Sequence, residues 1–114
     1  MRSVTYKRWD VVAVSYPFIE GDEAKRRPAV IVSGDDLNTS HGVYWVAMIT
    51  SAKFGQRPED IAVTDRRKAG LPESCVIRAS RLATLSDLQI AYRLGSITSK
   101  DRRAVTGFLK KHLP

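Results

Sequence analysis

Short segments rich in valine, isoleucine and aromatic residues recur along most of the chain, and this pattern constrains the fold more than any other feature. β-Branched and aromatic side chains suit the pleated backbone, so we expect these segments to form β-strands. They occupy residues 10–18, 28–34, 43–52 and 60–64, and segment 74–85 begins as a strand with Arg78 near its end. A last strand or an irregular segment is expected at 88–97. Charged or glycine-containing loops separate most of them.

The C-terminal segment changes to a helical period. A helix over residues 99–113 would carry on one face Ala104, Val105, Phe108, Leu109 and Leu113. Ser99 is the expected N-cap, with Asp101 in the first turn and basic residues in the last turn, where positive charge suits the helix dipole. We expect this helix to cover one side of the sheet. Residues 35–42 are expected to form a loop or a helical turn.

The number of strands relative to helices indicates the fold class. One helix for five or six short strands argues against a parallel α/β fold. We therefore predict a mainly β fold with a C-terminal helix, built as a small, strongly curved sheet or barrel. The length of 114 residues fits one domain spanning 1–114, and 43% hydrophobic with 27% charged residues is ordinary for a globular protein.

The charge of the chain points to the kind of partner. Nineteen lysines and arginines against twelve acidic residues give a net charge of +7. In so small a domain this excess favours a polyanionic partner, either a nucleic acid or an acidic protein segment. The alternative is that the charge serves only solubility.

Several features indicate the cellular compartment. The N-terminal ten residues are too polar for a secretory signal, and the longest apolar run, residues 43–49, is far shorter than the roughly 20 residues that span a bilayer. The single cysteine, Cys75, allows no internal disulfide and suits a reducing cytosol. We expect a cytoplasmic protein without a membrane segment.

Metal-dependent and nucleophilic chemistry find no support in the sequence. Two histidines and one cysteine show no ligand spacing, and there is no glycine-rich phosphate loop. Cys75 lies in an apolar strand pattern and is expected to be a small buried hydrophobe rather than a nucleophile. We predict no metal ion and no cofactor.

Arginines and hydroxyl residues at predicted strand ends are the remaining candidates for chemistry. They are Arg27 before one strand, Thr50 and Ser51 at the end of the next, and Arg78, Ser80 and Arg81 at the end of a third. If those strands are neighbours, these ends form a basic, hydroxyl-lined pocket. Such a pocket suits a phosphodiester, because guanidinium groups bind phosphate oxygens through paired N–H donors. Alternatively, Thr50 is an ordinary strand residue, Arg27 a solvated charge and Arg78 part of a surface ion pair.

The order of the segments resembles that of the PemK/MazF family of toxin endoribonucleases. The matching features are an Asp-Val-Val strand at residues 10–12, a charged loop ending in Arg27-Pro28, "AVIVS", Asn38, "VAMITS" ending in Thr50, "DIAV", "GLPESCVIRAS", "LATL", Leu94-Gly95 and a closing helix. The resemblance covers nearly the whole chain. It is carried by the ordered set rather than by one motif, and Trp9 stands where the family often has glycine.

The resemblance implies an SH3-like curved β-barrel of the PemK/MazF/CcdB type, usually a homodimer. It implies metal-independent, sequence-specific cleavage of single-stranded RNA by 2′-OH attack, which leaves a 2′,3′-cyclic phosphate and a 5′-hydroxyl. The family's catalytic arginine, threonine and second arginine correspond to Arg27, Thr50 and Arg78. Ser80 stands where some members carry an acidic residue, so the resemblance supplies no carboxylate base at that position.

The same resemblance implies the partners of the chain. The positions expected to contact RNA are Lys25, Arg26, Ser51, Lys53, Ser80 and Arg81. A cognate antitoxin with an acidic, partly disordered segment would cover the face around Arg27 and Arg78. One alternative is a gyrase-poison toxin on the same fold, which the ending "KKHLP" disfavours because that group uses an aromatic-glycine-hydrophobic end. The other is a non-catalytic nucleic-acid-binding barrel.

Overall fold

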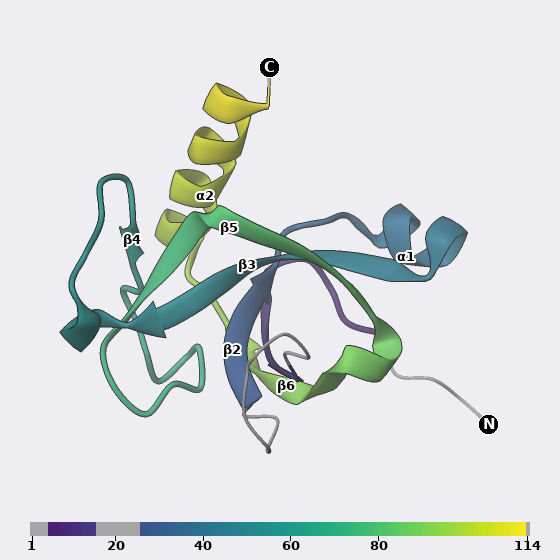
Figure 1. Ribbon diagram of the computed structural model, residues 1–114, viewed down its shortest axis with the longest axis horizontal. Coiled ribbons are helices and arrows are strands. Elements are labelled where there is room, and N and C mark those ends of the chain that lie inside the picture. The colour runs from purple at the N-terminus through teal and green to yellow at the C-terminus, as the bar shows by residue number, and fades with distance from the viewer. Residues whose placement is uncertain (1–4, 16–25, 114) are drawn as a thin grey trace.

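The computed structural model describes residues 5–15 and 26–113, and within them six strands form one antiparallel sheet in the order β4-β5-β3-β2-β1-β6 (Figure 1). The strands are β1 (Asp10–Ser15), β2 (Arg26–Ile31), β3 (Val43–Ser51), β4 (Ile61–Ala62), β5 (Cys75–Ser86) and β6 (Ile90–Ser96). The helices are α1 (Asp35–His41) and α2 (Ser99–His112), with short 3₁₀ turns η1 (Ala52–Phe54) and η2 (Asp87–Gln89). The prediction of a mainly β fold with a C-terminal helix is confirmed.

The sheet is strongly curved. Register shifts interrupt the β3–β5 pairing between Ala47 and Met48 and the β1–β6 pairing at two points of β1. Bulges of this kind bend a strand and increase its twist. Within the described residues the edge strands β4 and β6 are not paired with each other, so the sheet wraps round without closing through hydrogen bonds. This arrangement agrees with the predicted curved barrel.

Two hydrophobic clusters fill the two faces of this sheet, because successive side chains of a strand point to opposite faces. One cluster includes Val11, Val30, Ile49 and Ile77 and receives Val105 from α2. The other is built around Tyr44 and consists of the buried residues Tyr6, Val12, Val14, Ala29, Ile31, Tyr44, Val46, Met48, Leu85 and Ile90.

Of the strand boundaries that differ from the predictions, two affect candidate site residues. β2 begins at Arg26, so Arg27 lies within the strand rather than before it. β5 runs on to Ser86, so Arg78, Ser80 and Arg81 lie inside a long strand and not at its end. The register shift between Ala47 and Met48 lets β5 bend and continue to pair with β3 as far as Val43. The polar residues in this part of β5 gave no sign of the longer strand.

The C-terminal helix lies beside β4 and β5, at the yellow end of the chain in Figure 1. Its N-cap is Thr98, whose side chain accepts a hydrogen bond from the Asp101 backbone, so the prediction of Ser99 is off by one residue. Val105 is buried, but Ala104 and Leu113 are exposed, which corrects the predicted apolar face. The buried Asp101 carboxylate accepts hydrogen bonds from the backbone and the hydroxyl of Thr64 and so ties the helix to the loop after β4. Neither helix in the described residues has the length and apolar character needed to cross a bilayer.

Candidate active site

Arg27, Thr50 and Arg78 project from the same face of the sheet. Ala29 of β2 pairs with Met48 of β3, and Met48 pairs with Arg78 of β5. Arg27 and Thr50 each lie two residues from one member of that row, and residues two apart share a face. The three residues that the sequence pointed to therefore come from three neighbouring strands and share one side.

A pocket of about 370 Å³ opens where β2 starts and β3 ends. Its lining consists of Arg26, Arg27, Pro28, Ile49, Thr50, Ser51, Phe54, Leu71, Pro72, Glu73 and Cys75. Four of the predicted positions, Arg26, Arg27, Thr50 and Ser51, thus meet in one cavity. Part of the predicted basic, hydroxyl-lined pocket is present: Arg27, Thr50 and Ser51 line it over an apolar floor of core residues, whereas Arg78, Ser80 and Arg81 do not line it.

Glu73 is a pocket residue that the sequence analysis did not single out. It lies in the loop before β5 and brings a carboxylate to the cavity that contains Arg27 and Thr50. Its backbone carbonyl accepts a hydrogen bond from the Cys75 thiol at 3.4 Å, which fixes the loop beside the pocket. The only signal in the sequence was its place in "GLPESC", directly before the strand that carries Arg78.

Arg78 is held by a carboxylate that the sequence analysis also missed. Its Nη2 donates to Oδ2 of Asp60 at 2.8 Å and its Nε donates to Oδ1 at 3.2 Å. The side chains are only 12% and 3% exposed. The hydrogen bond from Arg78 holds the pKa of Asp60 below its ordinary value, and Asp60 in turn raises the pKa of Arg78. Arg78 therefore stands on the face of Arg27 and Thr50 as a fixed cation, although it is not part of the pocket lining.

The remaining predicted positions are more dispersed. Lys53 lies in η1 with its ammonium group over the ring of Phe54. Ser80 lines a different cavity, together with Phe108 and Leu109 of α2, and Arg81 is exposed on β5. Lys25 falls outside the described residues. The structure thus brings only part of the predicted RNA-contacting set to the pocket.

Cys75 behaves as expected for a structural residue. It is buried beside the pocket, and loss of solvation by burial raises the pKa of its thiol. Since the thiolate is the reactive form, this environment makes Cys75 a poor nucleophile. Among the described residues, no three His, Cys, Asp or Glu side chains lie close enough to hold a metal ion.

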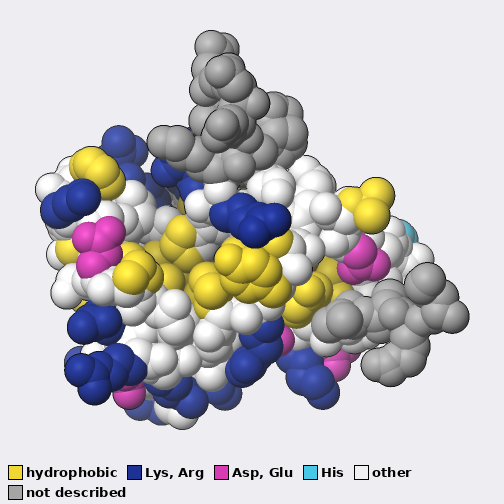
Figure 2. All heavy atoms as spheres, turned by 90° about the horizontal axis from the view of Figure 1, so that it is seen from below, with side chains coloured by type: hydrophobic (Ala, Val, Ile, Leu, Met, Phe, Trp, Pro, Cys, Tyr) yellow, Lys and Arg dark blue, Asp and Glu magenta, His cyan; other side chains and the backbone are white. Residues whose placement is uncertain are grey.

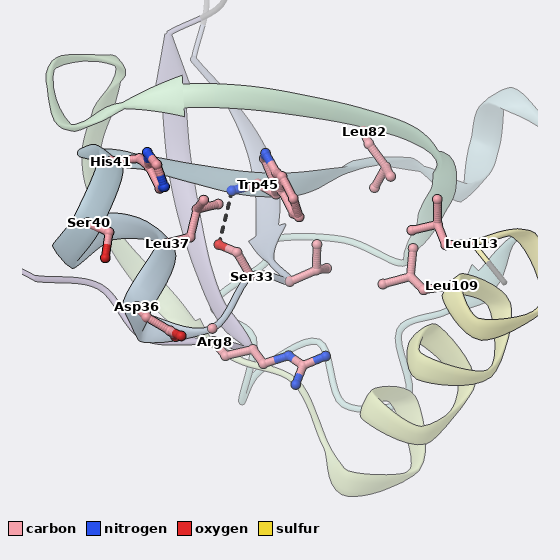
Figure 3. A pocket seen from close by; sticks show the side chains of 12 residues that line it. Arg8, Ser33, Asp36, Leu37, Ser40, His41, Trp45, Leu82, Leu109 and Leu113 are labelled. Carbon is pink, nitrogen blue, oxygen red and sulfur yellow. Dashed lines mark hydrogen bonds between the residues drawn. The ribbon is translucent and has the colours of Figure 1, made fainter.

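A larger cavity of about 510 Å³ lies between α1 and the end of α2 (Figure 3). Leu37, Trp45, Leu82, Leu109 and Leu113 point into it. The backbone N–H of Trp45 donates a hydrogen bond to the Ser33 hydroxyl at 3.0 Å. Its mainly apolar lining suits a hydrophobic surface rather than a phosphodiester, so size alone does not identify the active site.

Comparison with known proteins shows the family of the chain. The family model described as PemK-like, MazF-like toxin of type II toxin-antitoxin system matches residues 7–113. A comparison with curated proteins found no sequence match.

Solved structures share the fold at low sequence identity. MazF from Deinococcus radiodurans superposes with a TM-score of 0.76 at 21% identity, covering 97% of this chain and 98% of that one. A mycobacterial endoribonuclease in complex with its cognate antitoxin gives 0.72 at 18% identity, covering 96% and 93%. Mycobacterium tuberculosis toxin MazF-mt6 gives 0.70 at 15% identity, covering 91% and 95%. The predicted MazF-like fold is therefore confirmed.

Proposed function

Because the chain belongs to the family of PemK-like, MazF-like toxins of type II toxin–antitoxin systems, we propose that it is a sequence-specific endoribonuclease that cuts single-stranded RNA without a metal ion. The observation that carries the proposal is the meeting of Arg27, Thr50 and Glu73 in one pocket. Together they offer a cation, a hydroxyl and a carboxylate, which are the groups that cleavage by a 2′-hydroxyl requires.

In the proposed reaction the 2′-oxygen of the RNA attacks the adjacent phosphorus, and the bond from phosphorus to the 5′-oxygen breaks. Glu73 accepts the proton from the 2′-hydroxyl as general base. Arg27 stabilises the extra negative charge on the phosphorane through paired N–H donors, and Thr50 donates a hydrogen bond to a phosphate oxygen. The leaving 5′-oxygen takes a proton from water, and the hydroxide so formed takes up the proton held by Glu73, which restores the carboxylate. The products are a 2′,3′-cyclic phosphate and a 5′-hydroxyl.

Arg78 has a supporting role in this proposal. Asp60 and the carbonyl oxygen of Gly55 engage its Nε and Nη2. Among the described residues, Nη1 has no such bond and is left to reach a phosphate. A guanidinium held in one orientation needs no reorganisation when substrate binds, so Asp60 acts as a positioning residue for Arg78.

The proposed partner is a cognate antitoxin. The mycobacterial endoribonuclease is bound to its own antitoxin, and a MazE–MazF complex of Deinococcus radiodurans shares this fold with a TM-score of 0.74 at 19% identity, covering 97% of each chain. For this chain we expect an acidic, partly disordered segment that folds across the face of Arg27 and Arg78. We also propose a homodimer that acts in the cytoplasm.

The decisive test is incubation of the purified protein with a long RNA in EDTA, followed by mapping of the 5′ ends. We expect discrete cuts at a short sequence, and no cut where the 2′-hydroxyl at the cleavage site is replaced by hydrogen. Retention on RNA without cleavage would favour a non-catalytic barrel. Equal cutting of the 2′-deoxy substrate would contradict the proposed mechanism.

A further inference from the structure

Two exposed aromatic rings, each with a cation over its face, flank the proposed active-site pocket. Phe54 lines the pocket and is 74% exposed, and the Lys53 ammonium lies 5.4 Å from its ring centre. Tyr92 of β6 is 48% exposed, and the guanidinium of Arg26 lies 5.5 Å from its ring centre. Arg26 also lines the pocket, so each ring is at most one side chain away from it.

Local structure fixes the backbone that carries each ring. The Ser51 hydroxyl accepts a hydrogen bond from the backbone N–H of Lys53 at 3.3 Å, which begins η1 directly after the strand end that carries Thr50. The turn then closes with the N–H of Gly55 donating to the Ala52 carbonyl at 3.1 Å. Tyr92 lies in the β1–β6 ladder opposite Ala13. The backbone positions of both rings are therefore set before binding.

The order of the strands separates the two rings. β6, β1, β2 and β3 are successive strands of the sheet, so β1 and β2 lie between the strand that carries Tyr92 and the strand that η1 and Phe54 follow. The rings therefore lie toward different sides of β2, whose Arg26 and Arg27 line the pocket, and would hold different nucleotides. Figure 2 views the molecule from the side of β6 and the start of β2, and it shows a strip of hydrophobic side chains bordered by Lys and Arg.

We propose that Phe54 and Tyr92 are stacking platforms for two bases of a single-stranded RNA, on either side of the phosphate that is cut. Every base has an aromatic face that stacks on such rings, and a cation beside each ring can meet the adjoining phosphate. An acidic peptide would pair with Lys53 and Arg26, but it would not account for the two exposed aromatic rings. The position of the cut phosphate rests on the proposed function, whereas the stacking of bases does not depend on cleavage.

The test measures the affinity of a fluorescent single-stranded RNA and of an abasic ribose-phosphate chain of the same length, in an Arg27→Ala background that slows cutting. Loss of one stacked base typically weakens binding by about 5- to 150-fold, which corresponds to 1–3 kcal/mol. Phe54→Leu and Tyr92→Leu should each show a loss of this size for RNA but leave binding of the abasic chain unchanged. Phe54→Tyr and Tyr92→Phe keep a ring and should retain the affinity.

Salt dependence and a control variant complete the experiment. The leucine variants should keep the slope of log affinity against log salt, whereas Lys53→Gln and Arg26→Gln should each reduce it by about 0.7. Leu88→Ala, which changes an exposed apolar side chain of η2, should alter nothing. Since both rings are exposed, melting temperatures should stay the same.

The inference and the proposed function fail in different ways. If wild-type protein cuts RNA but the leucine variants bind RNA as tightly as their parent, the stacking proposal is wrong and the enzyme proposal stands. Equal losses for RNA and the abasic chain would also overturn stacking. If the variants lose affinity only for a glutamate-rich peptide, the rings serve a protein contact instead. Base-dependent losses in a protein that never cuts RNA would uphold stacking and refute the nuclease.

Discussion

At the scale of single residues, Arg26 and Arg27 are neighbours in the sequence but project from opposite faces of β2. Arg27 pairs with Val14, whose side chain belongs to the Tyr44 cluster, whereas Arg26 pairs with Ser15 and lies over Tyr92. Because successive side chains of a strand point to opposite faces of the sheet, the two arginines have different surroundings. One faces the side of Thr50 and Arg78, and the other stands beside an aromatic ring.

A residue-scale prediction concerns Asp60. Its carboxylate is nearly buried and binds Arg78, so Asp60→Asn should lower the melting temperature by a few degrees at neutral pH. The pKa of Asp60 is lowered in the folded protein from an ordinary value of 3.8, so its stabilising effect is present above that value and is lost as the pH falls through the folded pKa. The difference in melting temperature between wild type and variant should shrink at pH 3. An undiminished difference at that pH would contradict the ion-pair explanation.

A second residue-scale prediction concerns Glu73. If it is the general base, Glu73→Gln should lower single-turnover cleavage by roughly 10²–10⁴-fold. RNA affinity should change little. Glu59→Gln is the matched control, because Glu59 is an exposed carboxylate that pairs with Lys111. Cleavage by Glu73→Gln at the rate of the Glu59→Gln control would assign the base elsewhere.

At the scale of elements, the loop of residues 65–73 brings Leu71, Pro72 and Glu73 to the pocket and is seated on β6. Gly70 has a φ of 74°, and a Cβ at this position would overlap the carbonyl oxygen of Leu94. The N–H of Ser96 donates to the Lys68 carbonyl at 3.0 Å, which holds the loop to the end of β6. The position of the proposed base thus depends on a close approach between loop and strand.

Gly70→Ala should therefore displace this loop and reduce both the melting temperature and the cleavage rate. Gly42→Ala is the control, since Gly42 has a similar φ of 71° but open space around it. The control should lose about 1–2 kcal/mol of folding stability, the cost of the left-handed backbone conformation for alanine, and should keep its activity. Equal effects of the two substitutions on cleavage would show that the loop does not position the site.

The elements also show what could be predicted from the sequence. Val-rich segments indicated the strands, and the residues at the ends of two of them, Arg27 and Thr50, do meet. Asp60 was missed because its role depends on the pairing of β4 with β5, which no local pattern encodes. Phe54 and Tyr92 were missed because an apolar residue is expected in the core, and exposure is a property of the assembled sheet.

At the scale of the whole molecule, the open sheet and its apolar surface predict self-association. Within the described residues, β4 and β6 each have one edge that pairs with no other strand. The exposed side chains of Trp45, Leu82 and Leu113 line the larger cavity. Unpaired edges and apolar patches favour pairing with another chain. Sedimentation at micromolar concentration should give about twice 12.7 kDa. A clean monomer that still cuts RNA would show that the dimer is dispensable.

The central claim is that Arg27 stabilises the transition state of RNA cleavage. It is tested most directly by single-turnover cleavage, RNA affinity and melting temperature of Arg27→Ala, Arg27→Lys and Arg26→Ala. Arg27→Ala should cut roughly 10²–10⁴-fold more slowly with its fold intact, and lysine should rescue poorly because an ammonium lacks paired planar donors. Arg26→Ala should mainly weaken binding. Near wild-type cleavage by Arg27→Ala, together with an inactive Arg26→Ala, would contradict the account.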